Sequence, residues 1–201
     1  KKFKEDNALF LSEITEEHLG GVKLEPNKIS RTERQWIQVQ KSLNQDNISY
    51  LLKEELKSTM SSWCPPFNFI DFECSTSPLP FFKNQNPYQE VSFQFSHHTI
   101  DESWNIEHKT QYICFEKNTF PNFEFVRELK KAIGNDNGTI FRYHNHENTT
   151  LNKIREQLLR SHDSDKEDLV CFIDSITHGA GREDGERDMV GLFKLVIAYY
   201  Y

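Results

Sequence analysis

The order of its extended and helical segments is the feature that most restricts the fold of this chain. Three segments, at residues 67–73, 91–95 and 106–115, show the apolar alternation of strands. An amphipathic helical pattern, FEFVRELKKAIG, and a fourth extended segment, TIFRY, follow them. Short turns join antiparallel strands, whereas a helix connects parallel ones. The order therefore predicts an α/β fold with a mixed sheet, in which an antiparallel meander of three strands is joined through a helix to a parallel strand.

Helical spacing flanks this part of the chain on both sides. Two N-terminal helices are expected at residues 32–43 and 48–63, and Pro65-Pro66 ends the second one. Three more follow the fourth strand, at residues 149–160, 166–176 and from 187 to the end. At the end of the crossover helix, Gly134 is expected to adopt a left-handed cap.

This order is that of a ribonuclease H-like α/β core, in which the first strand is central. We expect a ribonuclease H-like domain over residues 65–201, after an N-terminal lead-in and helical extension over residues 1–64. The apolar run LFKLVIAYYY extends to the last residue without a polar cap. The domain is therefore expected to be truncated at its C-terminus.

Composition excludes a membrane protein and disfavours a basic nucleic-acid binder. No apolar run approaches the roughly 20 residues of a membrane helix, and no signal-peptide core follows KKFKEDN, so a cytoplasmic location without membrane partners is expected. The net charge of −7 opposes nonspecific attraction to phosphates, although segments 127–133 and 151–160 could form local basic helix faces. The alternative is that each segment is a solvated helix face. The four cysteines lack CxxC spacing and are expected to be reduced and mostly buried.

The run FIDFEC places two acids inside an apolar strand. Asp71 and Glu73 are two residues apart, so their side chains project from the same face and repel each other. A hard divalent cation is the simplest partner for such a pair, since magnesium is bound by one or two carboxylates together with substrate phosphates. The alternative is an ordinary surface strand whose polar face lies in water.

A second polar cluster, RYHNHENTTL, follows the fourth strand. One interpretation is a zinc site at His144 and His146, although further ligands would be needed. Another places Glu147 at the strand-to-helix junction, with its carboxylate directed at the D-x-E strand. A third is ordinary turn and cap chemistry, in which Asn145 or Asn148 bonds the backbone at the helix start.

The segments FIDFECSTSPLPFFKNQNPYQEVSFQFSHH, TIFRYHNHENTTLNKI, LVCFIDSIT and RDMVGLFKLVIAYYY together carry a resemblance over roughly residues 30–201. They resemble an uncharacterised bacterial domain-of-unknown-function family whose members are similar to DEDD-type, proofreading-like 3′-to-5′ exonucleases with a ribonuclease H-like fold. The resemblance implies a metal-dependent nuclease domain that acts on single-stranded ends of DNA or RNA. It also implies an upstream Cas4-like nuclease region in the full protein.

Carried over residue by residue, the resemblance assigns a catalytic and metal-binding role to three acids. Asp71 and Glu73 match the first motif, and Glu147 replaces the Asp of the second. They would hold Mg²⁺ or Mn²⁺ in a two-metal mechanism, with Asp71 bridging the ions. Gly191 stands where the family pattern MVDL has an acid, and the last acidic motif and the general base are not found. Two weak substitutes for the missing acid are Asp174 and Asp188.

Aromatic and histidine side chains near the first motif have competing explanations. Phe72, Phe81, Phe82 and Tyr88 could stack on bases of a single strand, although core packing explains Phe72 better. His97 and His98, at the end of the second predicted strand, are at least as well explained by structural hydrogen bonds. Two functions remain: a metal-dependent exonuclease, and a catalytically inactive ribonuclease H-like module that binds or scaffolds within a larger bacterial protein.

Overall fold

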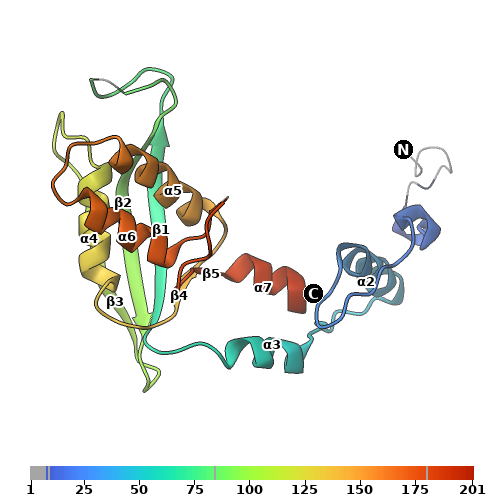
Figure 1. The fold of residues 1–201 in the computed structure, drawn as a ribbon. Coiled ribbons are helices and arrows are strands. Elements are labelled where there is room, and N and C mark those ends of the chain that lie inside the picture. Colours follow the sequence, from blue (N-terminus) through green and yellow to red (C-terminus); the bar gives the residue numbers. More distant parts are fainter. Residues whose placement is uncertain (1–7, 9, 84, 180) are drawn as a thin grey trace. The chain divides into compact units, whose positions relative to one another are not determined.

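The computed structural model describes residues 8, 10–83, 85–179 and 181–201. The described chain forms two compact units (Figure 1). One is Trp63–Leu192, and the other combines the described residues up to Ser62 with Phe193–Tyr201. No helix among the described residues is long and apolar enough to cross a membrane.

A five-stranded mixed sheet of order β3-β2-β1-β4-β5 forms the centre of the Trp63–Leu192 unit. The antiparallel meander consists of β1 (Phe67–Thr76), β2 (Glu90–Ile100) and β3 (Ile106–Ile113). The parallel strands are β4 (Ile140–Arg142) beside β1 and β5 (Val190–Gly191) beside β4. The predicted α/β architecture, with the meander, the parallel strands and the central first strand, is confirmed.

Three helices cover one face of this sheet (Figure 1). They are α4 (Asn122–Ile133), α5 (His146–Leu159) and α6 (Lys166–Ile176). Phe125 of α4 and Leu151 of α5 are fully buried in the same core cluster as Ile70 and Phe72 of β1. Since burial of one such side chain contributes about 1.5–3 kcal/mol, this apolar layer fixes which face of β1 points inward.

The alternation of β1 then sends its other side chains to the opposite face. Ile70 and Phe72 are 4% exposed, whereas the alternate residues Asp71 and Glu73 are exposed to solvent. This opposite face also bears Phe69, which stacks on Phe141 of β4 with ring centroids 4.9 Å apart. The two acids therefore project from the side of the sheet that α4, α5 and α6 leave uncovered.

The N-terminal unit contains two short 3-10 helices, η1 (Leu11–Glu13) and η2 (Glu17–Leu19), and the helices α2 (Arg31–Asn44), α3 (Lys53–Met60) and α7 (Leu192–Tyr199). A capping box starts α2, in which Ser30 Oγ accepts from the amide of Glu33 and Glu33 accepts from the amide of Ser30. Arg34 of α2 donates to the carbonyl of Val196 in α7 and to that of Tyr200 directly after α7, which ties α2 to the C-terminal end of α7.

Two predicted helices are wrong in extent. The helix expected at residues 48–63 is only α3, because the amides of Tyr50 and Leu52 donate to the carbonyls of Tyr201 and Tyr199 instead of forming a helical turn. The helix expected from residue 187 begins at Leu192, because β5 first pairs with β4. In both cases backbone pairing between distant segments replaces local helical bonds.

Two local expectations are also corrected. Gly134 is right-handed, with φ −78°, and is needed because a Cβ there would lie 2.4 Å from the carbonyl oxygen of Lys130. The four cysteines are free thiols, as predicted, but they are not mostly buried. Cys64 and Cys171 are exposed, since Cys171 lies on the outer side of α6 and Cys64 precedes the first strand.

Candidate functional site

The D-x-E pair lies on the central strand, at the end of its regular pairing. Asp71 is opposite Ser96 and Glu73 is opposite Gln94 on β2, and the register shifts directly after Glu73. Such bulges bend a strand and redirect its side chains, often beside functional sites. The regular pairing of β1 with β2 is thus interrupted directly after Glu73, whereas the pairing of β1 with β4 ends earlier, at Phe69.

Glu147 lies at the first turn of α5, immediately beyond the end of β4. Its residue is 3% exposed, and its Oε2 is buried without a hydrogen-bond partner. Burial raises the pKa of the Glu147 carboxyl, and the negative charge of Asp71 raises it further, while its own backbone amide, His146 and Arg142 oppose the rise. Glu147 therefore interacts electrostatically with Asp71 of the D-x-E strand.

Arg142 supplies a buried positive charge that the sequence analysis did not anticipate. It is 2% exposed, and its Nη1 donates to the carbonyl of His144 while its Nε has no partner. Burial lowers the pKa of its guanidinium. The negative charges of Asp188 and, to a smaller extent, Glu147 partly offset this decrease. Asp188 and Glu147 are therefore the acids that interact electrostatically with Arg142. An arginine inside the apolar strand TIFRY was the available signal, since a buried arginine needs an acidic partner.

A histidine–aspartate pair borders this charged region. Nδ1 of His178 lies 2.9 Å from both carboxylate oxygens of Asp188, so it must donate, because a carboxylate only accepts. This arrangement leaves Nε2 as the basic nitrogen of the ring. Of these two residues only Asp188 was considered from the sequence, as a substitute for the last acid. His178 was missed because its partner lies ten residues further along a loop.

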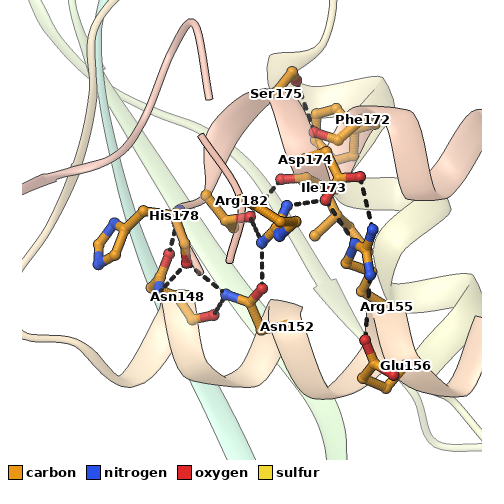
Figure 2. Close-up of polar contacts among 11 residues, drawn as sticks. Asn148, Asn152, Arg155, Glu156, Phe172, Ile173, Asp174, Ser175, His178 and Arg182 are labelled. Carbon is orange, nitrogen blue, oxygen red and sulfur yellow. Dashed lines mark hydrogen bonds and ion pairs between the residues drawn. The ribbon is translucent and has the colours of Figure 1, made fainter. Parts of the chain in front are cut away.

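Asn148, next to Glu147, fixes the backbone of His178 (Figure 2). Its side-chain oxygen accepts from the amide of His178, and its nitrogen donates to the carbonyl of His178, both at 3.0 Å. Asn152, one turn along α5, donates to the same carbonyl. In Figure 2 the imidazole points away from this amide clamp. The clamp holds the His178 backbone against the same turn of helix that carries Glu147.

Asp174 organises the remainder of this network (Figure 2). Its carboxylate accepts from Arg155 of α5, at 2.6 Å from Nε, and from Arg182 of the loop. Arg182 also donates to Asn152 and, at 3.2 Å, to the Thr177 hydroxyl. Asp174 is therefore occupied in tying the loop to α5 and α6. It is not available as the missing acidic ligand that the sequence analysis considered.

Two carboxylates at the site could contribute oxygen ligands to a divalent ion. Asp71 and the unpartnered Oε2 of Glu147 offer two carboxylates, which is the usual protein share of a magnesium shell. In the described part of the chain, no three His, Cys, Asp or Glu side chains are grouped closely enough to hold a metal together. Glu73 is not drawn into such a group, and Gly191, opposite Arg142 on β5, adds no carboxylate.

The other polar candidates have structural partners. His97 is buried, with Nε2 2.8 Å from Asn68 Oδ1 and Nδ1 2.9 Å from Thr110 Oγ1, so it is a structural histidine. Phe72 packs edge-on against Phe125 in the core, as favoured from the sequence. Phe81 and Tyr88 are exposed, on the connection between β1 and β2.

The two basic segments are neutralised by neighbouring acids. Arg127 of α4 bonds Asp165 at 2.7 Å and also Asp163, and Lys130 pairs with Asp168. On α5, Lys153 pairs with Glu90 at 2.8 Å, and Arg155 pairs with Asp174. These contacts favour the interpretation of segments 127–133 and 151–160 as solvated helix faces.

Fold and site together define a class: a mixed α/β domain in which a buried carboxylate, Glu147, follows β4 and is electrostatically coupled to Asp71 of the central strand β1. The chain belongs to a family described as a domain of unknown function (DUF2779), whose model matches residues 68–197. The match covers the sheet from the second residue of β1 onward, the three covering helices and each residue of the site. Comparisons with curated proteins and with solved structures gave no match.

Proposed function

We propose that this domain is a divalent-metal-dependent nuclease that hydrolyses phosphodiester bonds at single-stranded ends of DNA or RNA, in the 3′-to-5′ direction. The observation that carries the proposal is the Glu147 carboxylate, which is buried with an unpartnered Oε2 and electrostatically coupled to Asp71. A carboxylate left without a partner is costly, and proteins retain such groups mainly where a ligand completes them.

In this proposal Asp71 and Glu147 hold Mg²⁺ or Mn²⁺, and Glu73 orients the attacking water. Bound divalent ions would supply charge stabilisation at the scissile phosphate and lower the pKa of a bound water. His178, oriented by Asp188, accepts the proton of the water at Nε2 as the water oxygen attacks phosphorus and the P–O3′ bond breaks. Arg142 offsets part of the negative charge of Asp188 and Glu147 before an ion binds.

Substrate binding would rely on stacking more than on charge. The uncovered face carries Phe69 and Phe67 on β1, and Trp104, 71% exposed, lies 6.1 Å from Phe67 between ring centroids. Stacking of bases on aromatic rings contributes about 1–3 kcal/mol per base and tolerates any sequence. Since the basic helix segments are neutralised by acids, stacking next to the acidic strand favours a single-stranded end over a duplex.

The second candidate function is binding without turnover, as a ribonuclease H-like scaffolding module. The observation that favours it is that Gly191 offers no carboxylate and that no group of three potential metal ligands occurs among the residues that the structure describes. A module of this kind could still bind one ion and a single strand.

Calorimetric titration with Mn²⁺ separates these possibilities when it is paired with end-trimming assays. We expect one binding event that disappears in Asp71→Asn and persists in Glu156→Gln, a matched control on the exposed side of α5. A 5′-labelled single strand should then be shortened only with Mg²⁺ or Mn²⁺ present. Binding without trimming would favour the scaffolding module. Equal Mn²⁺ binding by wild type and Asp71→Asn would refute the carboxylate site itself.

A further inference from the structure

Two histidines on neighbouring strands direct ring nitrogens at each other. Nε2 of His98 on β2 lies 3.0 Å from Nδ1 of His108 on β3, and the rings are nearly perpendicular, at 77°. Both side chains are exposed, on the sheet face that carries Asp71 and Glu73. The proposed nuclease function does not use either residue.

A β-bulge creates this pair. His97 is opposite Thr110, and in an unbroken ladder His98 would then face Lys109. The register instead shifts, so that His98 faces His108 and Lys109 is the extra residue. Because a shift of one residue moves a side chain to the other face of a sheet, the bulge brings His108 from the His97 side to the His98 side.

Hydrogen bonding fixes the orientation of the second ring. Nε2 of His108 lies 3.1 Å from Oε1 of Gln111, which can only accept, so Nε2 carries the hydrogen. The lone pair of His108 is therefore on Nδ1 and points at His98. Metal-binding histidines commonly donate their other ring N–H to such an outer partner, which sets the tautomer and the ring orientation.

We propose that His98 and His108 form a two-histidine chelate for a late first-row divalent ion such as Ni²⁺ or Cu²⁺. With metal–nitrogen bonds of about 2.0–2.1 Å, the 3.0 Å separation corresponds to an N–metal–N angle of about 91–97°. This is the cis angle of tetragonal and octahedral ions, and imidazole is a preferred ligand of both metals. Water would occupy the other positions, and the hydrogen between the rings would move to Nδ1 of His98.

The test is a calorimetric titration of the full chain with Ni²⁺ in the presence of excess Mg²⁺, which competes for hard carboxylate sites. We expect one Ni²⁺ site that is lost in His98→Gln and in His108→Gln, and retained in His162→Gln, a matched exposed histidine. Gln111→Leu should weaken Ni²⁺ binding about 10- to 100-fold, the usual effect of losing an outer partner. Circular dichroism of each variant controls for folding.

Wild-type spectra provide a readout that does not depend on the variants. Bound Cu²⁺ should show electron paramagnetic resonance hyperfine coupling to two imidazole nitrogens. The proposal would be overturned if His98→Gln and His108→Gln both bound Ni²⁺ as the wild type does. It would also be overturned if only His146→Gln lost Ni²⁺ binding. Because Asp71→Asn should leave the Ni²⁺ site intact, failure of the nuclease proposal and failure of this one are distinguishable.

Discussion

Replacement of Glu147 by glutamine should stabilise the metal-free protein while removing its response to Mn²⁺. The buried Oε2 has no partner, and burial without a hydrogen bond costs about 1–3 kcal/mol for a polar group and more for a charged one. Glutamine keeps the shape and the acceptor oxygen but removes the charge. Part of the gain is offset, because Arg142 loses one of its two acidic neighbours and retains Asp188.

The net gain at neutral pH should therefore be on the order of 1 kcal/mol, which raises Tm by about 2–4 °C for a domain of this size. Mn²⁺ at about 100 times Kd should add roughly 2.7 kcal/mol to the stability of the wild type, and nothing to the variant. Thermal unfolding followed by circular dichroism, with and without Mn²⁺, measures both effects. Glu156→Gln, an exposed glutamate of the same helix, is the control.

The pH dependence gives an independent check. The pKa of Glu147 is raised in the folded state above its ordinary 4.5, so folding takes up a proton between the two values. The wild type should consequently gain stability relative to Glu147→Gln as the pH falls through the folded pKa. The free energies of unfolding of the two proteins should become similar near pH 4.5. A variant that is less stable than wild type at pH 7 and still responds to Mn²⁺ would show that Glu147 is a structural residue.

Three further predictions concern the framework of the site. Asp174→Ala should lower the free energy of unfolding by about 1–3 kcal/mol, since Arg155 and Arg182 lose a charged partner; urea denaturation measures this, and limited proteolysis should show earlier cleavage within residues 181–187. Burial lowers the pKa of His97, so stability should fall as the pH drops below the ordinary 6.5, and His97→Gln should flatten this slope in urea titrations between pH 5 and 7. Gly138→Ala should destabilise by about 1–3 kcal/mol or more, because its Cβ would lie 1.9 Å from the carbonyl oxygen of Pro66; an unchanged Tm would contradict that close approach.

The sequence alone was sufficient for the strands of the meander and for the acidic strand at its centre. Apolar alternation has a period of two, and residues such as Ile70 and Phe72 have one way to be buried together, which places Asp71 and Glu73 on the opposite face. The segment 166–176 was also predicted correctly, because its apolar residues repeat at helical spacing over three turns. In these places local pattern and burial agree.

Elements that depend on pairing between distant segments were not predictable in the same way. β5 has two residues and exists because Val190 and Gly191 add to β4, and residues 50–52 leave the helical pattern to pair with the C-terminal segment. Neither pairing leaves a periodic signal in so short a stretch.

The candidate site also has parts that the sequence indicated and parts that only the tertiary structure reveals. The D-x-E spacing and the family resemblance made Asp71 and Glu147 candidate site residues. The burial of Glu147, the electrostatic interaction of Arg142 with Asp188 and Glu147, and the orientation of His178 by Asp188 arise only when loop, strand and helix meet. The pairing of His98 with His108 is similar, since one bulged residue decides on which face His108 lies. Sequence determines which side chains a segment carries and which face they share. The tertiary structure decides their partners, because desolvation and Coulomb energies depend on distances between residues that are far apart in the chain.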